Sequence, residues 1–299
     1  MTKAEIIEKM NGLTFGADKY WVVAGAAMVL HGIKPETADI DLGCTKELAD
    51  RLEKEGNLHK VTEDGNRWFK IGDGIDVFEN WLYDRVEMIN DVPVISLNGL
   101  IEMKKRLGRE KDLRDIALIE GFLPKMVLIK PTEEYLLQIK NFRAEFEGQF
   151  DWIHGAQKLK NYEDPAKWLE FLTLCENEQT LPEGFHLYSQ FIFVRLSDRK
   201  IVGMIGFWHK PFGDLETWGG HIGYCVCPSE RQKGYATQML KKVLPYCKEM
   251  GLDRVLLTAG DENVGSVKTI LNSGGVFEKY YISPRHNRPI GRYWIDISV

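Results

Sequence analysis

One stretch of the sequence, His221 to Thr237, constrains the fold of this chain more than any other. It reads HIGYCVCPSERQKGYAT. Bulky and small residues alternate over Ile222 to Val226, as they do in a β-strand, and Pro228 ends that strand because proline offers no N–H group to a ladder. From Thr237 to Met250, apolar residues recur at helical spacing. The stretch therefore predicts a strand, a tight turn at Gly234 and a helix.

The predicted turn suits an anion. A helix that begins directly after a glycine points several unsatisfied N–H groups, and the positive end of its dipole, at one spot. Such a turn can cradle a pyrophosphate, and the small residues Gly234 and Ala236 let it approach the backbone. The plainer alternative is an ordinary strand–turn–helix connection.

The run Arg231 to Ala236 resembles the (Arg/Gln)-x-x-Gly-x-(Gly/Ala) signature of the GNAT acetyltransferases. In that family the turn binds the pyrophosphate of acetyl-CoA, and the preceding strand splays from the next one to admit the pantetheine arm. The resemblance covers roughly residues 126 to 299 and implies a GNAT fold with a splayed central mixed sheet. The coenzyme-binding residues that it implies are Cys225, Val226, Cys227, Arg231, Gln232, Lys233, Gly234, Tyr235, Ala236, Thr237, Asn263 and Ser266.

A second strand and helix complete the expected coenzyme site. Arg254 to Thr258 is expected to be the next parallel strand, splayed from the first to open a slot. The resemblance implies that Asn263 and Ser266 contact the coenzyme arm. Asn263 also suits the N-cap of the following helix, and this capping interpretation competes with the first.

Acetyl transfer to an amine needs a base, and the departing thiolate needs help to leave. Where the family often has a carboxylate base, this chain has His221, an imidazole that is neutral enough at cellular pH to accept a proton. Glu216 is the second candidate, and His221 could instead be an ordinary hydrogen-bonding histidine. Relatives often carry a tyrosine acid that residues 269–272 lack, so Tyr280 or Tyr281 would have to swing in, or the thiolate leaves unaided.

The N-terminal half carries two acids, Asp39 and Asp41, which share one face if residues 37–42 form a strand. Neighbouring carboxylates repel each other unless a cation lies between them. The pair is therefore a candidate Mg²⁺ clamp for nucleotide phosphates, with Asp76 in a second strand-like run as a third carboxylate. Alternatively, Asp39 and Asp41 form a turn-and-cap pair at a strand end.

Together with the dipeptide Gly25-Ala26, these acids resemble the nucleotidyltransferase superfamily over roughly residues 15 to 120. The resemblance implies that Gly25 and Ala26 hold the triphosphate, and that Asp39, Asp41 and Asp76 hold metal ions and activate a hydroxyl. The family turn is usually Gly-Gly or Gly-Ser, so Ala26 departs from it. A degenerate copy that serves as a binding or docking module would show the same pattern.

The segment Lys104 to Glu120 looks like the charged helical tail of small members of that superfamily. Its basic residues could meet a triphosphate or, on weaker grounds, RNA. The alternative is a solvated helix face stabilised by charge pairs.

A glycine and a proline, Gly121 and Pro124, end the first unit. The sequence therefore predicts an α/β (α+β) protein with a nucleotidyltransferase-like domain at 1–124, built on a mixed sheet with helices, and a GNAT domain at 125–299. A length of 299 residues accommodates both. The net charge of -5 argues against a large nucleic-acid surface. No apolar run approaches the ~20 residues of a membrane span, and the five scattered cysteines predict a reduced, cytoplasmic protein.

Residues 148–185 are rich in aromatics and acids, and Pro165 opens a helix whose Trp168, Leu172 and Cys175 share a face. This is either a core helix or the wall of an acceptor pocket in which acids favour a cationic amine. We expect an acetyl-CoA-dependent N-acetyltransferase whose amine acceptor and oligomeric state the sequence leaves open. The alternatives are an additional Mg²⁺-dependent transfer of a nucleotide from an NTP to RNA, an antibiotic or a protein, and a chain in which one half is a non-catalytic sensor.

Overall fold

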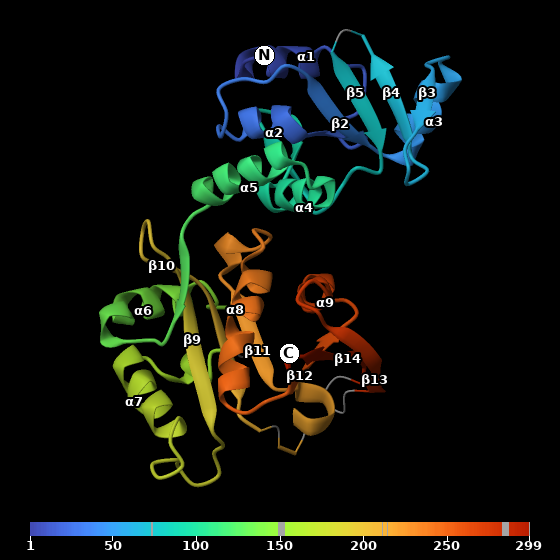
Figure 1. Ribbon diagram of the computed structural model, residues 1–299. Helices are drawn as coiled ribbons and strands as arrows, with labels where there is room; N and C mark the ends of the chain where they lie inside the picture. Colours follow the sequence, from blue (N-terminus) through green and yellow to red (C-terminus); the bar gives the residue numbers. More distant parts are fainter. Residues whose placement is uncertain (73, 149–152, 211, 214, 283–286, 299) are drawn as a thin grey trace. The chain divides into compact units, whose positions relative to one another are not determined.

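The computed structural model describes residues 1–298 except 73, 149–152, 211, 214 and 283–286. The chain divides into two compact units, Met1–Leu123 and Pro124–Val299, which are described separately (Figure 1). This division lies one residue before the boundary expected from the sequence.

The first unit alternates short helices and strands. Its elements are α1 (Lys3–Asn11), β1 (Tyr20–Val23), α2 (Ala24–Leu30), β2 (Ile40–Cys44), α3 (Lys46–Lys54), β3 (His59–Val61), β4 (Arg67–Ile71), β5 (Ile75–Glu79), β6 (Val86–Ile89), β7 (Val92–Ile95), α4 (Leu97–Leu107) and α5 (Glu110–Phe122).

The strands of this unit form one mixed sheet in the order β3-β4-β5-β2-β1-β7-β6. Two pairs are parallel, β2 with β5 and β1 with β7, and the other neighbours are antiparallel. One face of the sheet joins the helices in a core that contains Val22, Leu42 and Phe69. Buried and less buried residues alternate along β5, which is the pattern of a sheet covered on one face, whereas every residue of the central strands β1 and β7 is buried.

The strand expected over residues 37–42 begins later than predicted. β2 starts at Ile40, so Asp39 lies before the strand and only Asp41 lies within it. The hydroxyl of Thr37 donates to the carbonyl of Asp39, at 3.3 Å, and forms a local turn of the kind that Ser and Thr side chains favour. Only Asp41 therefore lies within the strand, and the alternative of a turn at the strand end describes Asp39.

The charged helical tail expected over residues 104–120 is two helices. α4 ends at Leu107 because Gly108 adopts a left-handed conformation, with φ at 63°, a common helix ending at glycine. Lys104 is only 3% exposed, and its ammonium lies 2.7 Å from the carboxylate of Asp115 and 3.5 Å from that of Asp112. Lys104 therefore ties α4 to α5, and neither the solvated-face nor the ligand-facing interpretation applies to it.

The second unit carries the longer strands. Its elements are β8 (Met126–Ile129), η1 (Glu133–Tyr135), α6 (Leu136–Ala144), η2 (Leu159–Asn161), α7 (Pro165–Cys175), β9 (Tyr188–Arg195), β10 (Lys200–Trp208), η3 (Leu215–Gly219), β11 (Ile222–Val226), η4 (Pro228–Glu230), α8 (Tyr235–Glu249), β12 (Arg254–Gly260), α9 (Val264–Leu271), β13 (Val276–Ile282) and β14 (Pro289–Asp296).

These strands form two sheets, one in the order β11-β10-β9-β8 and one in the order β12-β14-β13. Apolar residues of α8, among them Met239, Leu240 and Val243, join residues of both sheets in one core. Trp168 and Leu172 of α7 belong to a second core cluster, so α7 is a core helix, as the plainer interpretation predicted. None of the helices in the described part of the chain is long and apolar enough to cross a membrane.

Candidate functional site: a turn, a slot and a buried carboxylate

The turn between β11 and α8 places main-chain N–H groups at its surface. Gln232 and Gly234 both adopt left-handed conformations, with φ at 62° and 76°, and α8 begins at Tyr235 with Gly234 as its N-cap. Among the described residues, no side chain caps this helix. Since the first N–H groups of a helix have no partner within it, and the helix is 15 residues long, its N-terminus suits a bound phosphate.

A buried carboxylate lies beneath this turn. Glu230 is 5% exposed and accepts two hydrogen bonds from Arg195, at 3.0 and 3.1 Å. The ammonium groups of Lys233 and Lys200 lie 2.8 and 3.3 Å away. Burial raises the pKa of Glu230, but the hydrogen bonds from Arg195 and Lys233 outweigh it and lower the pKa to about 2. Glu230 therefore stays ionised and ties the turn to the hairpin of β9 and β10.

The analysis of the sequence did not single out Glu230. An acid between a proline and an arginine in a polar turn looks like an exposed residue. Its partner Arg195 lies 35 positions away, so no local pattern reveals the ion pairs.

The strand before the turn separates from the strand after α8. β11 and β12 belong to different sheets. They are joined where the N–H of His221 donates to the carbonyl of Leu256, at 2.8 Å, and the N–H of Leu256 donates to Nδ1 of His221, at 2.9 Å. Beyond this junction the strands share no ladder in the described part of the chain. The two strands are therefore joined at His221 and are not paired with each other toward the turn.

His221 serves as this junction. Because a main-chain N–H donates to its Nδ1, the hydrogen of the neutral ring lies on Nε2. Burial lowers the pKa of His221 to about 4, so the ring is neutral. A ring whose basic nitrogen is already hydrogen-bonded is a poor proton acceptor. The second candidate base, Glu216, is exposed in η3, and its main-chain carbonyl accepts from Arg292 at 2.9 Å.

At α9 the capping interpretation describes the structure. Oδ1 of Asn263 accepts from the N–H of Ser266, at 3.1 Å, so this side chain is engaged by its own helix. The carbonyl of Ser266 accepts from the hydroxyl of Tyr224, at 3.4 Å. Tyr280 and Tyr281 lie on β13, 54% and 38% exposed.

The end of β11 faces the protein more than the slot. Cys227 is fully buried, and its thiol donates to the carbonyl of Ile201 at 3.3 Å. Burial raises the pKa of the Cys225 thiol to about 12, so it is not a nucleophile at neutral pH. Gly155 lies against the other side of the strand: a Cβ there would be 2.2 Å from the carbonyl oxygen of Gly223. Part of the aromatic and acidic segment at 148–185 therefore packs against β11, although its residues 149–152 lie outside the described part.

Of the three acids of the first unit that were expected to bind metal ions, two lie at paired positions of neighbouring strands. Asp41 and Asp76 are register partners on the parallel strands β2 and β5, and Lys70 lies 3.8 Å from Asp76. Burial, followed by the charges of Asp39 and Asp76, raises the pKa of Asp41 to about 6. Nevertheless, no group of three or more His, Cys, Asp or Glu side chains within the described residues is placed to hold a metal ion. The structure thus does not show the expected Mg²⁺ clamp.

The dipeptide expected to hold a triphosphate lies in α2. Ala26 is fully buried, and a Cβ at Gly25 would lie 2.7 Å from the hydroxyl of Thr37. The hydroxyl of Thr37 thus occupies the side of Gly25 that a side chain would fill.

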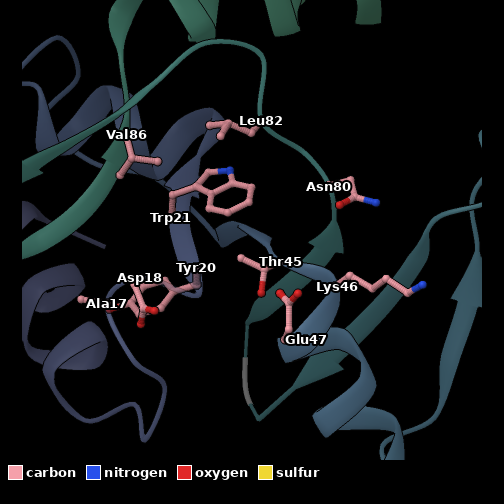
Figure 2. Close-up of a pocket in the computed structure, with 10 residues that line it drawn as sticks. All are labelled: Ala17, Asp18, Tyr20, Trp21, Thr45, Lys46, Glu47, Asn80, Leu82 and Val86. Atoms are coloured by element: carbon pink, nitrogen blue, oxygen red, sulfur yellow. The ribbon is translucent and has the colours of Figure 1, made fainter. Parts of the chain in front are cut away.

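The first unit also holds a pocket of about 660 Å³ to which neither the acids nor the dipeptide contributes. Figure 2 shows Trp21 in its wall, with Thr45 and Glu47 at the start of α3 and Asn80 across from them. The indole N–H of Trp21 donates to the carbonyl of Trp81, at 2.8 Å.

Residues 149–272 match the model of the Acetyltransferase (GNAT) family. No curated protein matches the chain. Among solved structures, the chain is similar to the ribosomal-protein-S5-alanine acetyltransferase from Vibrio fischeri, with 14% identity and a TM-score of 0.45 over 58% of this chain and 94% of that one. A spermidine N-acetyltransferase from Vibrio cholerae, in complex with CoA and spermine, shows 16% identity and a TM-score of 0.39 over 58% and 96%.

An acetyltransferase (GNAT family) from Bacillus anthracis shows 21% identity and a TM-score of 0.39 over 58% of this chain and 96% of that one. With TM-scores below 0.5, these likenesses do not bear on the activity of this chain. The family match bears on the activity, because it spans β11, the turn, α8, β12 and α9. Residues 149–272 are therefore an acetyltransferase domain of the GNAT family, and the chain is an acyltransferase.

Proposed function

We propose that this chain transfers the acetyl group of acetyl-CoA to an amine, with the coenzyme held by the turn at Gly234 and the slot between β11 and β12. The observation that carries the proposal is the uncapped N-terminus of α8, which follows a strand that has separated from β12 into a different sheet. A long ligand with a diphosphate at one end and a narrow arm fits this combination, because the helix start offers N–H donors and the separated strands offer a passage.

Bound acetyl-CoA supplies an acyl thioester, and the residues of this chain do the rest. The main-chain N–H groups from Gln232 to Thr237 hold the diphosphate. Glu230, through Arg195 and Lys233, fixes the backbone of the turn in the conformation that aims them. Residues of β11 line the slot and orient the arm, so that the acyl carbon is held beside the acceptor nitrogen.

We do not give His221 the role of base, because its Nδ1 is occupied by the N–H of Leu256. An acceptor amine that arrives neutral, or that loses its proton to water, needs no dedicated base. The acceptor stays open, and a panel of primary amines, polyamines and aminoglycosides, assayed by thiol release from acetyl-CoA, is the way to find it.

Isothermal titration with acetyl-CoA tests the proposal. The wild-type chain is expected to bind at micromolar concentration, and Gly234→Glu, which places a side chain and a negative charge at the cradle, is expected to abolish binding. Absence of binding by the wild type at hundreds of micromolar would end the proposal.

For the first unit we infer a second candidate function, the transfer of a nucleotide from an NTP with the help of Mg²⁺. The observation that favours it is the pairing of Asp41 with Asp76, together with the pKa of Asp41, which burial and the charges of Asp39 and Asp76 raise. A cation between these carboxylates would favour their ionised forms. Incubation with labelled NTPs, Mg²⁺ and RNA or cell extract tests it. A labelled product that Asp41→Asn does not remove would contradict the assignment, and a binding module would show ligand-induced stabilisation without product.

A further inference from the structure

The pocket of Figure 2 lies at one edge of the first unit's sheet, away from the paired acids. β1 runs antiparallel to β2, and β5 runs parallel to β2, so the start of β1 lies beside the ends of β2 and β5. Residues from these three places and from the start of α3 line the pocket. Asp41 instead pairs with Val23, at the other end of β1. A ligand in the pocket is therefore not the nucleotide of the second candidate function.

The inner wall of the pocket is fixed before any ligand arrives. Trp21 is only 6% exposed, and a Cβ at Gly43 would lie 2.0 Å from its Nε1, so the indole fills the place of a missing side chain on β2. Its N–H donates to the carbonyl of Trp81 in the segment after β5. With a volume of about 660 Å³, the pocket lies in the size range of small-molecule sites, which are usually largely pre-formed.

One side of the pocket is apolar. Leu82 and Val86 both line it and are 39% and 36% exposed. Figure 2 shows the two side chains together above Trp21. A ligand with an apolar group gains free energy by removing this surface from water.

The opposite side presents hydrogen-bond acceptors. The carboxylate of Glu47 lies near Thr45, across from the apolar side (Figure 2), and hydrogen bonds from its own N–H and then from the hydroxyl of Thr45 lower its pKa. An ionised carboxylate has about four acceptor positions, so positions remain for a ligand. The amide nitrogen of Asn80 donates to Oδ1 of Asn66, at 3.1 Å, which leaves the oxygen of Asn80 as the acceptor on the side of Trp21.

The nearby ammonium groups do not reverse this character. Lys46 extends away from Trp21 in Figure 2, and its charge helps to lower the pKa of the buried Glu79. The ammonium of Lys19 lies 3.2 Å from Asp18 and also lowers the pKa of Glu47. One ammonium group thus already lies beside these carboxylates, and the helix start is occupied by the chain's own carboxylate and offers no place to an external anion.

We propose that this pocket binds a small primary amine in its ammonium form, with an apolar group on Leu82 and Val86 and the ammonium between Glu47 and Asn80. An ammonium has three donors and no acceptor, which matches a polar side made of acceptors. Acetylation removes that charge, so the first unit distinguishes an amine from its N-acetyl derivative. Binding does not depend on the proposed function; only the statement that such an amine belongs to the acceptor class of the second unit rests on it.

Titration of the full-length chain with 2-phenylethylammonium, followed by calorimetry or ligand-observed NMR, tests the proposal. Two neutral probes of similar shape are 2-phenylethanol and N-acetyl-2-phenylethylamine. We expect the ammonium to bind at least about tenfold more tightly than either, because only the ammonium makes a charge-assisted hydrogen bond.

Matched variants locate the binding. Glu47→Gln should weaken binding of the ammonium about tenfold and leave binding of the alcohol unchanged, whereas Glu55→Gln, which removes an exposed acid at the other end of α3, should match the wild type. Leu82→Ser should weaken the ammonium and the alcohol alike, about fivefold. Leu58→Ser, at a leucine that is 92% exposed and outside the pocket, should change neither.

Three results would overturn the inference. The wild type could fail to bind the ammonium at millimolar concentration, or bind the alcohol equally well. Alternatively, Glu47→Gln and Leu82→Ser could both bind the ammonium as the wild type does, which places the amine elsewhere in the chain. Gly234→Glu separates this inference from the proposed function, because the variant should lose acetyl-CoA and keep the wild-type affinity for 2-phenylethylammonium.

Discussion

Two left-handed glycines flank α8, and replacing each by alanine separates the cost to the fold from the cost to coenzyme binding. Gly234 precedes the helix with φ at 76°, and Gly251 follows it with φ at 84°. In the left-handed region a Cβ costs about 1–2 kcal/mol. Both Gly234→Ala and Gly251→Ala should therefore lower the free energy of unfolding by a similar amount, measurable by urea titration.

Only Gly234→Ala should weaken coenzyme binding. If its Cβ and the accompanying backbone shift remove two hydrogen bonds from main-chain N–H groups to the charged diphosphate, at about 1.5 kcal/mol each, the loss is roughly 3 kcal/mol, or about 100-fold in Kd. A Cβ at Gly251 would have nothing within 4 Å, so Gly251→Ala should bind CoA as the wild type does. Isothermal titration measures both. Equal affinities for the two variants, or equal losses, would refute the reasoning that the turn at Gly234 grips the coenzyme.

Three further outcomes follow from the charges and hydrogen bonds. Glu230→Gln should lower the free energy of unfolding by roughly 3 kcal/mol at pH 7. Because the pKa of Glu230 is lowered, its ionised form stabilises the fold above about pH 4.5, and this contribution is lost as the pH falls toward 2. Thermal melts from pH 2 to 7 should therefore show a weaker pH dependence on the acid side in the variant. The pKa of Asp41 is raised to about 6. The protonated carboxyl group therefore favours folding below pH 4, and this contribution is lost as the pH rises through 6. Asp41→Asn should raise the melting temperature at pH 8 and leave it nearly unchanged at pH 4. His221→Gln should keep the pH dependence of acetyl transfer, since Nδ1 of His221 is occupied, and the disappearance of an acid limb in that variant would restore His221 as the base.

Local signals in the sequence were enough to predict the turn. Proline and glycine punctuate the stretch from β11 to α8, and the change from alternating to helical periodicity marks the two elements, so β11 was predicted with the bounds that the structure has. The start of α8 was predicted two residues late because Tyr235 and Ala236 were assigned to the turn. Gly108 is a similar signal for the end of a helix, but the many charged residues on both sides of it led to the prediction of one continuous helix.

Features that depend on distant partners could not be predicted in this way. The burial of Glu230 depends on Arg195 and Lys200 of a hairpin, and the tautomer of His221 depends on Leu256. The pairing of Asp41 with Asp76 follows only from the register of β2 and β5. Such placements are set by tertiary packing, which spacing along a chain does not encode.

Amide hydrogen exchange of the peptide that covers Arg231 to Met239, with and without acetyl-CoA, tests the central claim most directly. If the main-chain N–H groups at the start of α8 hold the diphosphate, their exchange should slow on binding, while the peptide around Gly251 at the other end of the helix should be unaffected. Binding of acetyl-CoA without any protection between Gln232 and Thr237 would contradict the account.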